Sequence, residues 1–164
     1  MKQNETCCFF GHRKINETTE LINNLNSIIE DLIVNKNVEN FLFGSKSDFN
    51  GSCYDVVTTL KEKYPYIKRI YVRAEFPYIN DDYRDFLLEL YEETYFPEKM
   101  IDAGRAVYIE RNCEMIDNSR FCVVYYDENY IPSRKNKKSG TKIAYDYAVK
   151  KGKEIINVND AKGM

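Results

Sequence analysis

The sequence lacks the features that mark membrane, secreted and zinc-binding proteins. Its longest apolar runs, such as residues 121–126, are far too short to span a bilayer, and its first residues are too polar for a signal peptide. The five cysteines are an odd number, and no CxxC motif or Cys/His pair has the spacing of zinc ligands. We therefore expect a cytoplasmic protein with reduced thiols, no metal and no cofactor.

A surplus of positive charge is also missing. The chain has 24 lysines and arginines against 26 acidic residues, for a net charge of -2. Broad binding to nucleic acid normally relies on excess cations that displace counterions, so we do not expect nucleic acid as a partner. One basic patch, residues 134–138, is the exception. The length of 164 residues fits one domain, residues 1–164, with a substantial core.

Strand and helix signals alternate along the chain, and the segment from 91 to 103 is ambiguous. Apolar runs that end at Gly11 and Gly44 indicate strands, and helical spacing of apolar residues follows each of them. Strands separated by helices pair in parallel, which predicts a Rossmann-like α/β fold with an open sheet of about five strands and helices on both faces. The expected strands are 6–10, 39–43, 67–72, 121–126 and 154–158, and the expected helices are 17–34 (capped by Asn16), 52–64, 81–91, 106–118 and 141–151.

Three strand-to-helix turns carry the residue types of a phosphate site. Small residues let backbone amides approach an anion, and the start of a helix adds the positive end of its dipole. In an open parallel sheet, ligands bind beyond the carboxyl ends of the strands, where such turns meet. The candidate ligand-binding residues in these turns are Gly11, His12, Arg13, Gly44, Ser45, Asp48, Ser139, Gly140 and Thr141.

Arg111 and Asn112 complete the set of candidate ligand-binding residues. Their helical spacing places both at the border of the buried stripe of the helix over 106–118. A buried cation needs a partner, because an unpaired one costs several kcal/mol. A bound phosphate is one candidate partner of Arg111, and an ion pair with Asp117 or another acid is the alternative.

Taken in order, four motifs resemble the SLOG superfamily of Rossmann-like proteins. They are Gly-His-Arg at 11–13, Gly-Ser-x-Ser-Asp at 44–48, RNxxMxD at 111–117 and Ser-Gly-Thr at 139–141. The superfamily includes relatives of the DNA-processing protein DprA and of the LOG enzymes, and the chain is most similar to its small stand-alone, YpsA-like bacterial branch. The resemblance covers nearly the whole chain. It implies a nucleotide-type ligand over Gly11, Gly44 and Gly140, and a homodimer.

The chain departs from the LOG enzymes at one position. Their PGGxGTxxE element supplies a glutamate for glycosidic cleavage, and Ala144 stands where that glutamate would be. The resemblance therefore favours a binding protein for a phosphate-bearing nucleotide, with Tyr145 as a candidate contact to base or ribose. A LOG-like hydrolase using Glu75 or Asp127 is the alternative. Single-stranded nucleic acid binding through the basic patch is weaker still.

Overall fold

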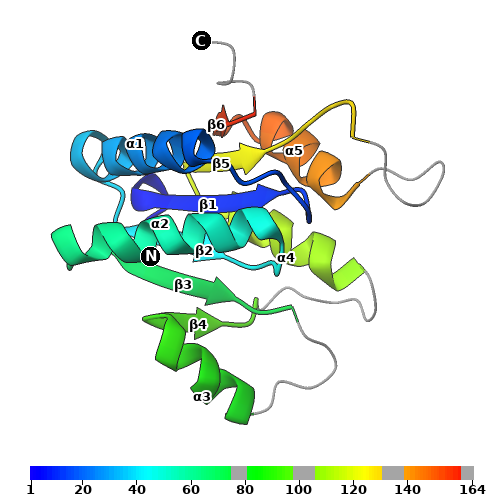
Figure 1. Cartoon of the computed structure of the whole chain (residues 1–164). Coiled ribbons are helices and arrows are strands. Elements are labelled where there is room, and N and C mark those ends of the chain that lie inside the picture. Colours follow the sequence, from blue (N-terminus) through cyan, green and yellow to red (C-terminus); the bar gives the residue numbers. More distant parts are fainter. Residues whose placement is uncertain (75–80, 98–105, 131–138, 160–164) are drawn as a thin grey trace.

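The computed structural model describes residues 1–74, 81–97, 106–130 and 139–159. These residues form one open sheet of six parallel strands with helices on both faces, as expected from the sequence except for the sixth strand (Figure 1). None of the helices in these ranges has an apolar stretch of membrane-spanning length. The strands are β1 (Thr6–Gly11), β2 (Asn40–Phe43), β3 (Lys68–Val72), β4 (Glu93–Tyr95), β5 (Phe121–Tyr125) and β6 (Glu154–Asn157), and the helices are α1 (Thr19–Lys36), α2 (Asp48–Lys63), α3 (Asp81–Leu90), α4 (Ala106–Asp117) and α5 (Gly140–Lys150).

The strand order is β4-β3-β2-β1-β5-β6, so the winding reverses at β1. The chain first builds outward through β2, β3 and β4, and then returns to place β5 and β6 on the other side of β1 (Figure 1). A ligand crevice in such sheets forms outside the carboxyl ends of the strands at the reversal. The topology therefore marks the carboxyl ends of β1 and β5.

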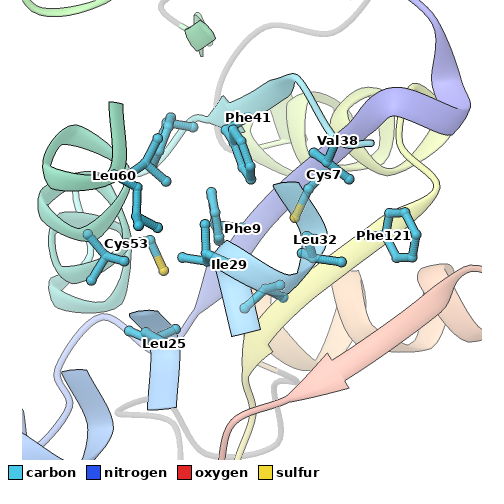
Figure 2. Packing of buried hydrophobic residues seen from close by; sticks show 14 of the residues in the cluster. Cys7, Phe9, Leu25, Ile29, Leu32, Val38, Phe41, Cys53, Leu60 and Phe121 are labelled. Atoms are coloured by element: carbon cyan, nitrogen blue, oxygen red, sulfur yellow. The ribbon is translucent and has the colours of Figure 1, made fainter. Parts of the chain in front are cut away.

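Helices α1 and α2 cover one face of the sheet with large side chains. Phe9 stacks on Phe41 at 5.9 Å between ring centroids and lies 5.0 Å from Phe43. Figure 2 shows Leu25, Ile29 and Leu32 packing toward this cluster from α1. This face is an apolar core that fixes the strands from which the turns emerge.

Helices α4 and α5 cover the other face with smaller side chains. Cys8, Cys122 and Val124 of the strands pack against Met115 of α4 and Ala148 of α5, and all five are buried. The Sγ atoms of Cys8 and Cys122 are 3.6 Å apart and both thiols are free. Small side chains let these two helices lie close to the strands.

Several boundaries differ from those predicted. Thr18, rather than Asn16, caps α1, because its hydroxyl accepts a hydrogen bond from the Leu21 amide at 3.1 Å. Helix α2 begins one turn earlier than expected, at Asp48. Strand β4 comes from the segment that the sequence left ambiguous, where only three residues pair with β3.

Candidate functional site

A cleft of about 770 Å³ opens at the carboxyl ends of the strands. Its volume lies in the range of about 300–1,000 Å³ that is typical of small-molecule sites. The cleft is bordered by the turns after β1 and β2, by α4 and by the start of α5. Every predicted ligand-binding residue lines it except Asp48; they are Gly11, His12, Arg13, Gly44, Ser45, Arg111, Asn112, Ser139, Gly140 and Thr141.

The turn after β1 holds His12 in a fixed orientation. The Asp127 amide donates a hydrogen bond to His12 Nε2 at 2.9 Å, and the imidazole stacks on Tyr130 at 4.1 Å between centroids. Burial lowers the pKa of His12 below its ordinary value of 6.5, although Asp127 acts in the opposite direction. Because Nε2 accepts a hydrogen bond, the neutral ring carries its proton on Nδ1 and can donate from there.

Packing requires glycine at position 11, which the sequence did not reveal. A Cβ atom at this position would lie 2.5–2.9 Å from the ring and Cβ of Phe49, which is fully buried in the first turn of α2. Such distances are shorter than van der Waals contact, so the strand-to-helix turn closes over Phe49 only with glycine at its base. Gly11 shapes the cleft through this packing as well as lining it.

The turn after β2 leads into α2 and is hydrogen-bonded to the turn after β1. Ser47 caps the helix by accepting a hydrogen bond from the Asn50 amide at 3.2 Å, and its hydroxyl lies 2.9 Å from that of Ser45. Asp48, which lies outside the cleft lining, donates its amide to the Arg13 carbonyl at 2.8 Å and accepts from the Ile15 amide at 3.4 Å. Asp48 therefore positions the turns after β1 and β2 relative to each other.

Arg111 lies across Gly44. It is 5% exposed, and a Cβ atom at Gly44 would stand 2.8 Å from its Cδ and Nε atoms. Asn112 Oδ1 accepts hydrogen bonds from Arg111 Nε and Nη2 at 3.3 and 3.2 Å, and the guanidinium lies 5.7 Å from the Tyr108 ring centroid. Because residue 44 has no side chain, the Arg111 side chain can extend from α4 over the turn after β2 to the cleft.

Asp117, the alternative partner for Arg111, belongs to a separate network. Its carboxylate accepts from the Tyr147 hydroxyl at 2.8 and 3.0 Å and lies 3.9 Å from Lys151 Nζ. These contacts join the end of α4 to α5. Asp117 therefore holds the two helices of this face together.

Helix α5 presents its first turn to the cleft. Ser139 caps the helix by accepting from the Lys142 amide at 3.0 Å, and Gly140 and Thr141 line the cleft beside it. The positive end of the helix dipole thus borders the cleft. Ala144, at the position of the LOG glutamate, is 1% exposed and packs in the core.

The polar side chains in the described lining of the cleft are cationic or neutral. It contains three cationic side chains, those of Arg13, Lys46 and Arg111, together with hydroxyls and an amide, and no carboxylate among the residues the structure describes. Asp127 does not line the cleft, and its carboxylate accepts from the Asn129 amide at 2.9 Å. Glu75 and the basic patch 134–138 lie outside the described residues. This distribution of charge favours an anionic ligand.

The tyrosines that line the cleft differ from Tyr145, the one expected from the sequence. Tyr71, Tyr83, Tyr108 and Tyr130 line it, whereas Tyr145 stacks on Tyr126 at 4.5 Å between centroids and does not. Tyr71 lies in β3, Tyr83 in α3, Tyr108 in α4 and Tyr130 in the segment after β5, and only the folded chain brings them together. Among the described residues, no group of three or more His, Cys, Asp or Glu side chains is placed to hold a metal ion.

Comparison with known proteins finds a distant structural likeness. No family model matches the sequence, and no curated protein matches it. Among solved structures, the chain is similar to DNA processing protein A from Helicobacter pylori, a structure described for its single-stranded DNA binding mode. The two share 13% sequence identity over 97% of this chain and 79% of that chain, with a TM-score of 0.48.

Proposed function

We propose that this protein binds a small phosphate-bearing nucleotide in the cleft at the carboxyl ends of its strands. The observation that carries the proposal is the polarity of the cleft, where cations, hydroxyls and a helix N-terminus gather and the described lining has no carboxylate. The tyrosines beside them offer flat surfaces to a base. The proposal agrees with the ligand implied by the SLOG resemblance, and membership of the YpsA-like branch is part of it.

Arg111 is the residue on which we expect binding to depend most. Its guanidinium is held against Gly44, Tyr108 and Asn112, so little side-chain freedom remains to be lost when a phosphate binds. Hydrogen bonds to charged groups contribute about 1.5–3 kcal/mol each. Losing the Arg111 contact should therefore weaken nucleotide binding by about tenfold to more than a hundredfold.

A matched pair of arginine variants tests this role. Arg111→Ala should lose affinity for nucleoside phosphates in isothermal titration. Arg120→Ala should keep it, because Arg120 lies at the opposite edge of the sheet in a surface ion pair with Glu154 at 2.6 Å. Such pairs contribute about 0–1 kcal/mol to stability. If Arg111→Ala lowers the melting temperature and leaves affinity unchanged, Arg111 is structural and the proposal loses its main residue.

Binding of a nucleotide and its cleavage can be distinguished by analysing the nucleotide after long incubation with the protein. We expect wild-type protein to return nucleotides intact in chromatography of long incubations, since Ala144 replaces the LOG glutamate within the core. Release of free base over several turnovers, abolished by Glu75→Gln, would favour the hydrolase instead. No thermal shift with any nucleoside phosphate at millimolar concentration would contradict the proposal as a whole, because a ligand in excess must stabilise the state it binds.

Single-stranded nucleic acid is the second candidate, and the exposed aromatic rings at the cleft favour it. Tyr108 and Tyr130 are 55% and 41% exposed, and exposed rings can stack with successive bases. An oligonucleotide should then compete with a mononucleotide and bind more weakly as salt rises. Equal binding of mononucleotide in the presence of excess oligonucleotide would reject this second candidate.

A further inference from the structure

His12 keeps one ring nitrogen available, although the residue is almost completely buried. It is 3% exposed and lines the cleft. Its Nε2 atom accepts the hydrogen bond from the Asp127 amide, whereas its Nδ1 atom has no hydrogen-bond partner among the described residues. The side-chain atoms of the described residues that are both fully buried and unpartnered belong to Asn50, Arg73 and Tyr95. Nδ1 of His12 is not one of them, so it keeps accessible surface at a residue that borders the cleft.

Contacts on several sides fix the direction in which Nδ1 points. The ring stacks on Tyr130 at 4.1 Å between centroids, and the rings of Tyr125 and Tyr126 lie at 6.3 and 6.0 Å. The His12 amide donates to the Tyr125 carbonyl at 3.3 Å, which joins the turn after β1 to the end of β5. The imidazole therefore has little freedom to lose when a ligand binds.

The surroundings keep the imidazole neutral, with its proton on Nδ1. A second proton would have to sit on Nε2, where it would displace the hydrogen bond from the Asp127 amide. The cationic side chains of Arg13, Lys46 and Arg111 line the same cleft and disfavour a further positive charge. The Asp127 carboxylate acts in the opposite direction, but burial outweighs it and lowers the pKa of His12. Nδ1 is therefore a hydrogen-bond donor at neutral pH.

We propose that the Nδ1–H group of His12 donates a hydrogen bond to a phosphate oxygen of the bound nucleotide, and that the Asp127 amide positions this donor by fixing the tautomer. The inference rests on the proposed function, because it assigns one contact within the nucleotide site. The described lining of the cleft offers no carboxylate to Nδ1–H, and phosphate oxygens are strong acceptors. His12 is then a neutral contact that complements the cationic contact of Arg111.

A pair of substitutions separates the two nitrogen atoms of the ring. In His12→Asn, the amide nitrogen stands as many bonds from the backbone as Nδ1 and keeps a donor there. In His12→Gln, the amide oxygen stands as many bonds away as Nε2 and can still accept from the Asp127 amide, but no donor remains at the Nδ1 position. Isothermal titration with AMP should show affinity lowered about tenfold or more in His12→Gln and largely kept in His12→Asn. Equal affinity of His12→Gln and the wild type would overturn the inference.

The wild-type protein allows a direct measurement, because His12 is its only histidine. Nitrogen NMR of protein with isotope-labelled histidine shows which ring nitrogen carries the proton. We expect the proton on Nδ1 before and after AMP is added, and a shift of the Nδ1 resonance with AMP or with inorganic phosphate alone. Adenosine, which lacks the phosphate, should leave that resonance in place. A shift with adenosine but not with phosphate, or a ring protonated on both nitrogens in the complex, would overturn the inference.

The outcomes separate this inference from the proposed function. If the wild type binds neither AMP nor phosphate, the proposed function fails and the His12 contact with it. If AMP binds the wild type and His12→Gln alike and leaves the Nδ1 resonance in place, the cleft binds nucleotides and only the role of His12 is wrong. Circular dichroism checks the fold of each variant. The spectrum of the wild-type protein decides the question if a variant is unfolded or if both variants lose affinity.

Discussion

The two edges of the sheet are built differently, although the same strands form both. At the amino edge, backbone hydrogen bonds link residues at or just before the starts of neighbouring strands into a continuous row. At the carboxyl edge, backbone hydrogen bonds such as His12 N to Tyr125 O (3.3 Å) also link neighbouring segments, but the turns that follow the strands border the cleft. The bonds of the row are Glu39 N to Glu5 O (2.9 Å), Lys68 N to Glu39 O (2.7 Å), Arg120 N to Thr6 O (3.0 Å) and Glu154 N to Arg120 O (3.1 Å).

This difference indicates a division of roles between the edges. Backbone groups at the amino edge are satisfied within the protein, so substitutions there should change stability alone. The carboxyl edge keeps donors and cations at an open surface, where a bound anion can use them. Substitutions at that edge should change ligand affinity, and some should change stability as well.

Gly44→Ala should have the largest effect on the carboxyl edge. Its Cβ atom would stand 2.7 Å from Met115 Sδ and 2.8 Å from Arg111, so the guanidinium must leave its place over the turn. We expect about 1–3 kcal/mol of lost stability from overpacking. Nucleotide affinity should fall at least about tenfold, as expected for a displaced charged contact. Denaturant unfolding and titration calorimetry measure the two effects, and unchanged affinity would argue against Arg111 as a ligand contact.

Thr6→Val tests the amino edge with a side chain of the same shape. The buried Thr6 hydroxyl donates to the Lys2 carbonyl at 2.6 Å and accepts from Asn40 Nδ2 at 3.4 Å. Its loss should lower the free energy of unfolding by about 1–2 kcal/mol, because both partners lose a hydrogen bond. Affinity for nucleotide should match that of the wild type. A selective loss of affinity would break the division between the two edges.

His12 should give the smallest effect, a dependence of stability on pH. Its pKa in the folded protein is lowered by burial, so the unfolded chain binds more protons between that value and about 6.5. The free energy of unfolding should therefore fall as pH decreases below about 6.5, and this contribution should level off below the folded pKa.

The variant His12→Gln isolates this contribution, because the sequence has no other histidine. Urea unfolding of both proteins from pH 7.5 to pH 5.5 supplies the comparison. The wild type should lose more stability than the variant over this interval. A larger loss in the variant would mean that the folded protein favours the charged imidazole.

Much of the site could be predicted because parallel pairing brings every strand-to-helix turn to one edge. Apolar runs ended by Gly11 and Gly44 identified two of those turns, and helical spacing identified Arg111. The positions of individual contacts could not be predicted in this way. That Gly44 lies beneath Arg111, and Gly11 beside Phe49, depends on how α4 and α2 pack on the sheet.

The set of tyrosines that lines the cleft and strand β4 could not be predicted from a single sequence. Tyr71, Tyr83, Tyr108 and Tyr130 lie far apart in the sequence with no shared spacing, so no local pattern relates them. Strand β4 is three residues long and is defined by its pairing with β3. Such features arise from tertiary contacts, which override weak local preferences.

The buried thiols make the two layers of the core separately observable. Cys7 and Cys53 lie in the layer under α1 and α2 (Figure 2), and Cys8 and Cys122 lie in the layer under α4 and α5. Burial raises the pKa of Cys7 and Cys53, so in the native state these thiols are protonated and out of reach of alkylating reagents. Each becomes reactive only when its own layer opens. Alkylation followed by peptide mass spectrometry would therefore time the opening of each layer in the unmodified protein and show which one a bound nucleotide holds closed.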